Sequence, residues 1–331
     1  MLIKEALLKE ELNNIKDFLN KFDLSMDAVT HTIYAEIDDK IVGTVSCNND
    51  IIKCLAVDPL YQSENVSNLL ITEIINYLNS NNIYSYLVFT KPMYDKVFLS
   101  LGFRKIIMDE NVILLEGGNE RITDKINKIK TQIEFSIGSL NDNTDLAAIV
   151  INANPITIGH EHLIETASKN HDYVVVFVVE EDKSIFKFDE RLSMVYLTCK
   201  RLNNVVVVPS SKYIVSQLTF PTYFLKEDLV EKEHAMIDAL IFRDYFCKIL
   251  PIKKRYLGKE TKKKMVSYNT ILKEVLGDKI IEIDRLKLDN EIVSASFVRM
   301  LLENHQYEEC LKYIPKQIQT VFMMVAKSHY E

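Results

Sequence analysis

The sequence has few of the residues that build the commonest nucleotide-binding loops. Only eight of its 331 residues are glycine and seven are proline, and neither GxxxxGK(S/T) nor GxGxxG occurs in it. A P-loop and a dinucleotide-binding fingerprint are therefore excluded. The sequence also lacks an apolar run of the ~18 residues that a membrane-spanning helix needs. The opening stretch "MLIKEALLKEELNN" mixes charged and apolar residues, unlike a signal peptide.

Cysteine and basic charge are also limited. The five cysteines are dispersed, and no two form a CxxC pair. An odd, scattered set favours reduced thiols in a cytoplasmic protein over a disulfide framework or a zinc site. The formal net charge of -7 disfavours nucleic acid as a partner, and nothing predicts a membrane partner. The composition, 47% hydrophobic and 26% charged, is that of a globular protein, and the length predicts two domains.

Alternating apolar residues and amphipathic stripes predict an α+β domain over residues 1–115. Residues 1–20 have the spacing of an amphipathic helix, and residues 31–48 have that of a β-hairpin. Further elements are expected at 51–58 (strand), 67–82 (helix), 84–90 (strand), 92–103 (short helix and turn) and 104–116 (hairpin).

The pattern changes after residue 116. A Gly–Gly pair precedes a charged helical stretch, so we expect a connecting segment over residues 116–144. Beyond it, over residues 145–331, Val- and Ile-rich strands alternate with helices. This alternation predicts a Rossmann-like α/β domain with a parallel sheet covered on both faces. The expected strands are 146–152, 173–179, 204–210, 253–259 and 279–286, with helices at 160–170 and 188–202.

A strand, a polar turn and a helix follow one another around "NANPITIGHEHLIETA", residues 152–167. The first amide groups of a helix are unpaired and its dipole favours negative charge, so this turn predicts an anion site. Asn152 and Asn154 can turn the chain, and Gly159 lets the backbone approach a ligand closely. Thr157 and His160 lie three residues apart, so their side chains converge. Their donors suit a phosphoryl group in transfer, and the imidazole adds charge if it is protonated.

The form "NPITIGH" resembles the HxGH signature of the nucleotidyltransferase superfamily, in which the first His is often Thr. A second signature of that superfamily, ISxTxxR, is matched near the C-terminus by "VSASFVR", with Val for Ile and Ser for Thr. Two motifs in the right order outweigh the simpler interpretation of each as a helix cap. The HEH triplet at 160–162 lacks a third ligand nearby in sequence, so no metal site is expected there.

Longer segments resemble the citrate lyase ligase family, and residues 1–115 resemble GNAT acetyltransferases, as the N-terminal domain of that family does. The segments are "NANPITIGHEHLIETA", "EEDKSIFKFDER", "VVVVPSSKYIVSQLTFPTYFLK", "IDALIFRDYF" and "VSASFVRMLL". The resemblance implies that ATP activates acetate as acetyl-AMP with release of pyrophosphate. Acetate is then joined to the thiol of the dephospho-CoA-like prosthetic group on the citrate lyase acyl carrier subunit, and AMP is released. Mg²⁺ is expected to bridge the ATP phosphates, mainly with water ligands.

The resemblance also implies roles for residues at matching positions. His160 and Thr157 should contact the α-phosphoryl group during transfer. Ser294 and Ser296 should bind the β- and γ-phosphates, with support from Arg299. Further ATP contacts are expected from residues near the carboxyl ends of the first two strands of the domain, where open α/β sheets bind ligands: Asn152, Ala153, Asn154, Gly159, Lys187 and, as the preferred cation, Arg191.

The role of the N-terminal domain is left open. GNAT proteins bind the CoA pyrophosphate through Q/R-x-x-G-x-G/A, and at the matching place Asn65 and Ser67 replace the small residues. We therefore expect weakened or lost acetyl-CoA binding, with the carrier protein or its prosthetic arm as another candidate ligand. The alternative functions are an adenylyltransferase acting on a phosphopantetheine-like or mononucleotide acceptor, and an N-acetyltransferase with a nucleotide-sensing domain.

Overall fold

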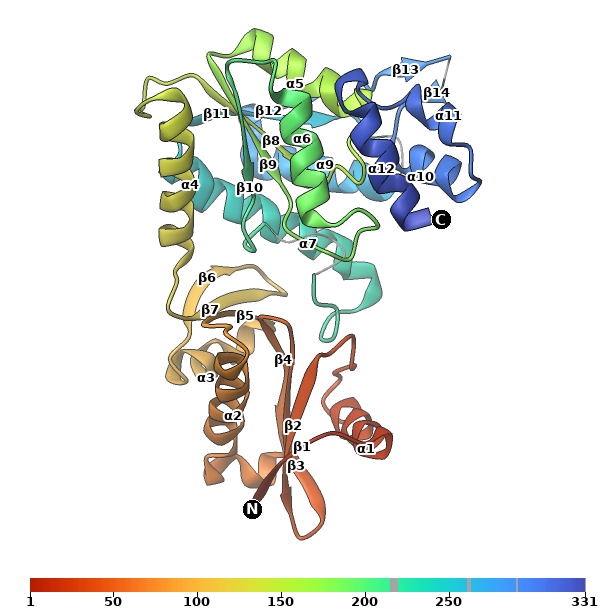
Figure 1. Cartoon of the computed structure of the whole chain (residues 1–331). Coiled ribbons are helices and arrows are strands. Elements are labelled where there is room, and N and C mark those ends of the chain that lie inside the picture. Colours follow the sequence, from red (N-terminus) through yellow and green to blue (C-terminus); the bar gives the residue numbers. More distant parts are fainter. Residues whose placement is uncertain (215–219, 261–262, 290, 331) are drawn as a thin grey trace. The chain divides into compact units, whose positions relative to one another are not determined.

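The computed structural model describes residues 1–214, 220–260, 263–289 and 291–330, with the side chains of 63, 64 and 263–266 left undescribed. The chain forms two compact units (Figure 1). The N-terminal unit comprises Met1–Arg121 and Pro221–Glu233, and the C-terminal unit comprises Ile122–Phe220 and His234–Glu331. No helix in the described part of the chain is long and apolar enough to cross a bilayer.

One mixed sheet with helices on both faces makes up the N-terminal unit. Its elements are β1 (Leu2–Glu5), α1 (Lys9–Asn20), β2 (His31–Ile37), β3 (Lys40–Asn48), β4 (Ile51–Val57), η1 (Pro59–Glu64), α2 (Val66–Ser80), β5 (Ser85–Thr90), η2 (Pro92–Tyr94), α3 (Asp95–Ser100), β6 (Arg104–Met108) and β7 (Ile113–Gly118). The strand order is β1-β2-β3-β4-β5-β7-β6. On β2, Ile33 and Ala35 pack in the core formed with α2, whereas Tyr34 donates to Glu11 of α1. Because side chains alternate along a strand, α1 and α2 cover opposite faces.

The start of the chain differs from the predicted helix over residues 1–20. Leu2–Glu5 forms β1, which pairs antiparallel with β2, and α1 begins at Lys9. Charged and apolar residues are mixed in this stretch in a way that fits an edge strand as well as a helix. Pairing with β2 satisfies the backbone groups of β1, so a tertiary contact decides the outcome.

The N-terminal sheet opens between β4 and β5. These two strands run parallel and pair at Ile51–Leu87 and Ile52–Val88, after which they separate. β4 is irregular just beyond this point, because its register against β3 shifts and Cys54 has a φ of 55°. Past Val88, the two strands therefore no longer pair with each other, and a gap forms between them.

A parallel sheet forms the centre of the C-terminal unit. Its elements are α4 (Ile122–Ile137), β8 (Leu146–Ile151), α5 (Ile158–Asn170), β9 (Tyr173–Val178), α6 (Phe188–Cys199), β10 (Val205–Pro209), α7 (Glu227–Ile241, whose first residues belong to the N-terminal unit), η3 (Phe242–Phe246), α8 (Cys247–Ile249), β11 (Ile252–Gly258), α9 (Lys263–Leu276), η4 (Gly277–Lys279), β12 (Ile280–Ile283), β13 (Lys287–Leu288), β14 (Glu291–Ile292), α10 (Ala295–Glu303), α11 (Tyr307–Leu311), η5 (Lys316–Ile318) and α12 (Gln319–Tyr330). The order β10-β9-β8-β11-β12 is parallel throughout. All five predicted strands of this domain are confirmed.

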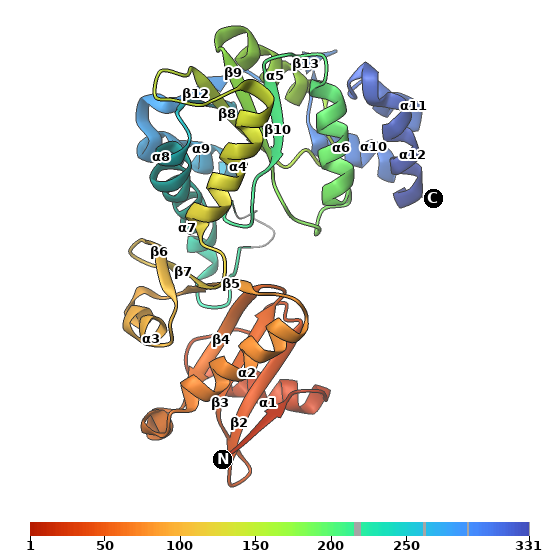
Figure 2. The ribbon, with the colours of Figure 1, turned by 60° about the vertical axis from the view of Figure 1, so that its left-hand side comes forward.

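This sheet is buried on both faces, as its Val- and Ile-rich strands predict. On one face Ile149 and Val176 pack in a core that includes Met194 of α6 and side chains of α5, α10 and α12. On the other face Phe177 meets Phe246 of η3 edge-on, with ring centroids 5.4 Å apart. Figures 1 and 2 show α5 and α6 on one side of the strands and α4, α7 and α9 on the other. The carboxyl ends of the strands share one edge, where such sheets bind ligands.

The units divide the chain differently from the predicted boundaries at 115 and 144. Gly117 and Gly118, predicted to begin the connection, end β7 instead. A Cβ atom on Gly118 would lie 2.0 Å from the carbonyl oxygen of Tyr84, and one on Gly117 would lie 2.2 Å from the ring of Tyr86. The glycine pair therefore permits close strand packing rather than a flexible link, and α4 belongs to the C-terminal unit.

Candidate nucleotide-binding site

The predicted anion site begins where β8 ends and α5 begins. Thr157 is the N-cap of α5, and its backbone N–H donates to Nδ1 of His160 at 3.0 Å. The Thr157 hydroxyl lies 2.9 Å from the same ring nitrogen. His160 thus occupies the third helical position, where Glu or Gln often closes a cap by accepting this bond. Because Nδ1 is the acceptor, the proton of the neutral ring lies on Nε2.

The charge state of His160 follows from its surroundings. Burial, and next the positive charge of Arg285, lower the pKa of His160 from 6.5 to about 4. The ring is therefore neutral at pH 7, and it offers Nε2–H as a hydrogen-bond donor. The sequence left open whether His160 carries a charge. The structure indicates that any positive charge at the site comes from other residues.

The two motifs lie side by side although they are far apart in the sequence. Nη1 of Arg299 donates to the backbone carbonyl of Asn154. A Cβ atom on Gly159 would lie 3.4 Å from the backbone oxygen and from Cγ1 of Val293. A Cβ atom would thus be in ordinary contact with Val293, which shows that α5 packs directly against the second motif. The amino-terminal end of α5 and the segment that leads into α10 form one cradle.

The second motif supplies a helix N-terminus. Ser294 is the N-cap of α10, and its hydroxyl accepts a hydrogen bond from the N–H of Phe297 at 3.1 Å. Ser296 lies in the first turn, with its hydroxyl 3.4 Å from Nη2 of Arg299. The first amide groups of α10 remain available to an anion, and the helix dipole favours negative charge there.

Arg191, the preferred cation of the sequence analysis, is fully buried. Its Nε donates to the carbonyl of Phe186 (3.0 Å), and Nη1 donates to the carbonyl of Val179 (3.0 Å). The guanidinium also donates to the carbonyl of Glu181 and to both oxygens of Asn152. These acceptors occupy donors on all three of its nitrogens. This placement favours a role in shaping the loops after β8 and β9 over direct phosphate contact.

The asparagine side chains hold the same loops together. Nδ2 of Asn152 donates to the hydroxyl of Ser184 (3.2 Å), and Oδ1 of Asn154 accepts from the N–H of Phe186 (3.2 Å). Ala153 between them has a φ of 52°, in the left-handed region. Lys187 is exposed at the N-cap of α6, and its Nζ donates to the carbonyl of Asp182 at 3.1 Å. Of the two predicted loop cations, Lys187 is the one that faces solvent.

The sequence analysis missed Arg285, a cation whose charge acts on His160. It follows the carboxyl end of β12, where its Nε donates to the carbonyl of Lys259 (3.0 Å) and its guanidinium pairs with Glu260. The next residue, Leu286, accepts from the N–H of Val293 (3.0 Å), which ties this turn to the second motif. A basic residue just beyond the carboxyl end of a predicted strand was the signal that could have identified it.

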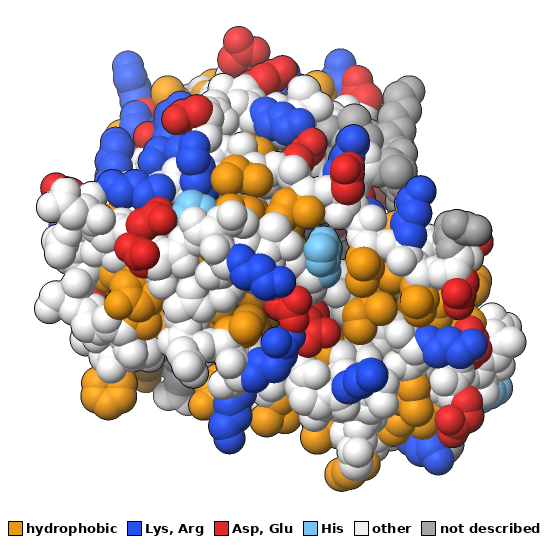
Figure 3. Space-filling model, turned by 90° about the horizontal axis from the view of Figure 1, so that it is seen from above, with side chains coloured by type: hydrophobic (Ala, Val, Ile, Leu, Met, Phe, Trp, Pro, Cys, Tyr) orange, Lys and Arg blue, Asp and Glu red, His pale blue; other side chains and the backbone are white. Residues whose placement is uncertain are grey.

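Several other basic residues are paired with acceptors. Figure 3 shows Lys and Arg side chains gathered toward the upper left of that view, with Asp and Glu among them. In the basic run that begins at Lys253, Nζ of Lys254 donates to the carbonyl of Asp278 (2.7 Å) and Lys259 pairs with Asp284 (3.2 Å). Residues 261–262 of this run, and 215–219 of the segment "VVVVPSSKYIVSQLTFPTYFLK", lie outside the described residues. Within the described residues, no group of three or more His, Cys, Asp or Glu has a metal-binding arrangement.

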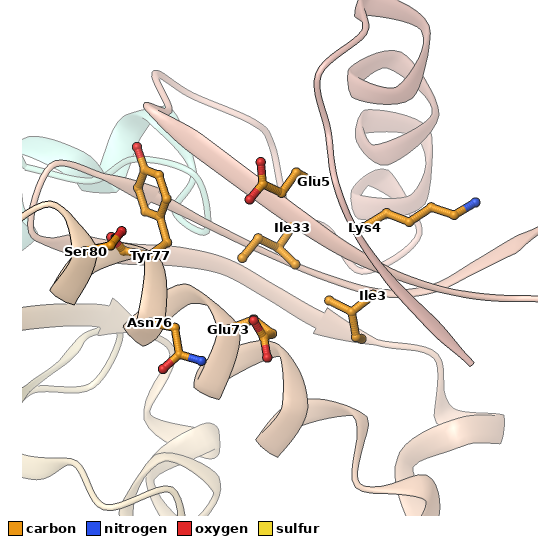
Figure 4. Close-up of a pocket in the computed structure, with 8 residues that line it drawn as sticks. All are labelled: Ile3, Lys4, Glu5, Ile33, Glu73, Asn76, Tyr77 and Ser80. Atoms are coloured by element: carbon orange, nitrogen blue, oxygen red, sulfur yellow. The ribbon is translucent and has the colours of Figure 1, made fainter.

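The N-terminal unit offers little for a CoA pyrophosphate. Asn65 adopts the left-handed conformation (φ 59°) at the start of α2, where GNAT proteins carry glycine. A cavity of about 530 Å³ lies near the other end of α2 (Figure 4). Its lining includes Glu5, Glu73 and Tyr77, and Lys4, the one basic residue lining it, pairs with Glu36. Two carboxylates make this cavity unsuitable for a polyanion.

The cysteines show no sign of a reactive thiol. All five are free, and four of them are buried. Burial raises the pKa of Cys54 and of Cys199 to about 12, so neither is a thiolate at neutral pH.

The sequence matches the models of two known protein families. Residues 146–322 match the family model of the citrate lyase ligase C-terminal domain, and residues 4–113 match an acetyltransferase (GNAT) domain. Citrate (pro-3S)-lyase ligase of Klebsiella pneumoniae is 30% identical, over 100% of this chain and 97% of its own. The Haemophilus influenzae and Escherichia coli proteins of that name are 32% and 29% identical, over 93% and 92% of this chain and 93% and 88% of theirs.

A GNAT-family acetyltransferase of Staphylococcus aureus is similar in structure to part of the chain. It has 17% identity and a TM-score of 0.31, and the match covers 36% of this chain and 99% of the other. The family model covers more than half of the chain, and the relatives match nearly its whole length. This chain therefore belongs to the citrate lyase ligase family of enzymes, with a GNAT-type N-terminal domain and the C-terminal domain of that family.

Proposed function

We propose that the protein is an ATP-dependent ligase that activates acetate as acetyl-AMP. It then acetylates the prosthetic-group thiol of the citrate lyase acyl carrier subunit, and it releases AMP and pyrophosphate. The observation that carries this proposal is the cradle in which a neutral His160 on α5 lies beside the amino-terminal end of α10. Family membership supplies the carrier subunit as the acceptor.

The first step forms a bond between an acetate oxygen and the α-phosphorus and breaks the bond to pyrophosphate. We assign the Nε2–H of His160 and the hydroxyl of Thr157 to the α-phosphoryl oxygens, where charge develops. The first amides of α10, with Ser294 and Ser296, would hold the leaving pyrophosphate. Arg285 and Lys187 would supply the positive charge that a neutral His160 lacks. No protein nucleophile is required, because positioning and charge neutralisation act on the reacting groups.

The second step transfers the acetyl group. The thiol sulfur attacks the carbonyl carbon of acetyl-AMP, the bond to the AMP oxygen breaks, and the thiol proton passes to solvent or to the departing phosphate. For Mg²⁺, the described residues around the cradle provide no cluster of carboxylates, so phosphate and water oxygens would be its main ligands. When bound, the ion would offset the negative charge of the phosphates.

The two alternatives predict different substrates. An adenylyltransferase would need a phosphomonoester acceptor in place of acetate. An N-acetyltransferase would need to bind acetyl-CoA in the N-terminal unit. There, Asn65 and Ser67 stand where GNAT proteins have Gly or Ala, and the lining of the cavity near α2 includes two carboxylates. The relatives that match nearly the whole chain are named as ligases, which favours the ligase over both alternatives.

The test is pyrophosphate exchange into ATP by the full-length protein, with acetate, a phosphomonoester or no acid added. We expect exchange that depends on acetate, followed by a mass increase of one acetyl group on the thiol-bearing carrier subunit when ATP and acetate are both present. Exchange that needs a phosphomonoester would establish the adenylyltransferase. Acetyl transfer from acetyl-CoA without ATP would establish the N-acetyltransferase.

A further inference from the structure

The turns that follow β11 and β12 are joined to each other beside the candidate site. The backbone N–H of Lys259, the first residue after β11, donates to the carbonyl of Ile283, the last residue of β12, at 2.8 Å. Nε of Arg285 in turn donates to the carbonyl of Lys259 at 3.0 Å. Arg285 is the cation whose charge acts on His160, so its position depends on where these two turns lie.

A side chain on α9 joins the two strands just before these turns. Nδ2 of Asn269 donates to the carbonyl of Gly258, the last residue of β11, at 3.0 Å, and to Oε1 of Glu282 on β12 at 2.9 Å. An amide nitrogen carries two N–H groups, so these two bonds use both of them. Asn269 is 5% exposed. This residue therefore ties the carboxyl ends of β11 and β12 to α9.

Glu282 has a second partner on the same helix. Nζ of Lys273, one turn further along α9, donates to Oε2 of Glu282 at 2.6 Å. The lysine side chain is 50% exposed, and ion pairs that solvent reaches contribute little to stability. The amide of Asn269 is shielded from competing water, which strengthens its hydrogen bonds. Of the two contacts, the one from Asn269 is therefore the one that fixes the strand ends.

A buried network fixes α9 itself. The hydroxyl of Tyr268, the neighbour of Asn269, donates to Oδ2 of Asp238 on α7 at 2.6 Å, and Nη2 of Arg255 on β11 donates to the same oxygen at 3.0 Å. Asp238 and Arg255 are 4% and 1% exposed, and the guanidinium lies 4.3 Å from the centre of the Phe242 ring. Separating this pair would leave a buried charge without its partner, so α9 is held against β11. Asn269 thus projects from a rigid support.

The turn after β12 is also connected to both sequence motifs. Arg285 precedes Leu286, whose carbonyl accepts from the N–H of Val293 at 3.0 Å. A Cβ atom on Gly159 would lie 3.4 Å from Val293, and Gly159 precedes His160. A series of contacts within the C-terminal unit therefore connects α9 with the first motif.

We propose that Asn269 is a positioning residue for Arg285. By joining the carboxyl ends of β11 and β12 to α9, it sets the place from which the guanidinium offsets the charge of the nucleotide phosphates. That electrostatic effect depends on the distance between the charges, so a displaced turn weakens it. This inference rests on the proposed function, in which Arg285 supplies positive charge at the cradle.

The kinetic test is a double-mutant cycle in the full-length protein. It compares the parent with Asn269→Ala, Arg285→Gln and the double variant, and its control is Ser267→Ala, a change at an exposed serine of α9. In acetate-dependent pyrophosphate exchange, Asn269→Ala should slow turnover ~3–10-fold, because small misplacements of a participating group are costly. Added to Arg285→Gln, the same change should slow turnover less than about twofold, since its effect acts through the missing guanidinium.

Ser267→Ala should stay within about twofold of the parent. An unchanged rate in Asn269→Ala, or an equal effect of this change in both backgrounds, would overturn the proposal.

NMR titration of His160 without substrates separates this inference from the proposed function. Displacing the guanidinium weakens its repulsion of the imidazolium, so the pKa of His160 should be higher in Asn269→Ala than in the parent, as in Arg285→Gln. In the Arg285→Gln background, Asn269→Ala should leave this pKa unchanged. A general loss of stability would not produce this pattern. If the alanine variant does not fold, Asn269→Ser takes its place, because a serine hydroxyl is too short to bridge both acceptors.

The outcomes of the titration are distinct. A pKa of His160 that does not move in Asn269→Ala would refute the positioning role even in an active ligase. A pKa that moves as expected in a protein without acetate-dependent exchange would keep the positioning role and reject the ligase.

Discussion

Replacing His160 tests the chemistry and the helix cap separately. His160→Asn keeps an acceptor oxygen near the position of Nδ1, so the Thr157 N–H can remain bonded, and it removes the Nε2–H donor. Losing one donor to the developing charge should lower kcat in acetate-dependent pyrophosphate exchange by ~10²–10³, or about 2.7–4 kcal/mol of transition-state stabilisation. His160→Ala removes both functions and should in addition lower the free energy of unfolding by about 1–2 kcal/mol.

The matched control is His162→Ala, two residues further along the same helix. It should change kcat less than about threefold, since the family resemblance gives it no role. Urea denaturation at pH 7 should place His160→Asn close to the parent in stability and His160→Ala below it. A His160→Asn enzyme whose kcat stays within a few-fold of the parent would refute the donor assigned to Nε2.

The lowered pKa of His160 adds a dependence of stability on pH. The unfolded imidazole takes up a proton near pH 6.5, whereas the folded ring resists protonation down to about pH 4. Since the unfolded state binds more protons in this window, the contribution of His160 is complete above pH 6.5 and is lost as the pH falls toward 4. His160→Asn lacks this term. The urea midpoint of the parent should therefore fall below that of His160→Asn as the pH falls from 7 to 4, and a difference that stays constant with pH would contradict the neutral ring.

Three further predictions concern charge, burial and backbone. Arg285→Gln should raise the pKa of His160 in an NMR titration and slow pyrophosphate exchange ~10-fold, and an unmoved pKa would show that the two groups do not interact. Arg191→Met should lower the free energy of unfolding by about 3–5 kcal/mol in urea, because buried carbonyls lose their donor; a loss below 1 kcal/mol would contradict that role. Gly118→Ala should destabilise far more than Gly138→Ala, measured by thermal unfolding. Both glycines have φ near +87°, a backbone conformation that costs alanine about 1–2 kcal/mol. Only at Gly118 would the Cβ atom lie 2.0 Å from a backbone oxygen, so equal losses of stability in the two variants would refute the steric argument.

Much of the C-terminal unit could be predicted because its determinants are local. Val- and Ile-rich strands, polar turns and helix periods repeat in order, so the parallel sheet follows from the pattern. The strand, turn and helix around Thr157 likewise indicate an anion site at a helix entry. The longer segments indicated the citrate lyase ligase family, and the comparisons confirm it.

Site residues were harder to assign, because a residue's role depends on its neighbours in space. Arg191 has the position of a phosphate ligand in the sequence, yet the carbonyls that take its donors come from two loops that close over it. Arg285 belongs to neither motif and comes near His160 only because β12 lies beside β11. The placement of both arginines depends on packing between residues far apart in sequence, which no local sequence pattern indicates.

The sequence by itself therefore determined the elements, the two-domain composition and the family, since these depend on periodicity, capping and short motifs read along the chain. Only the tertiary structure decided that residues 2–5 form an edge strand, that residues 221–233 complete the N-terminal unit and that His160 is neutral. Each of these outcomes arises from the pairing or burial of groups far apart in sequence. The free energy of such pairing or burial depends on which groups the fold brings into contact.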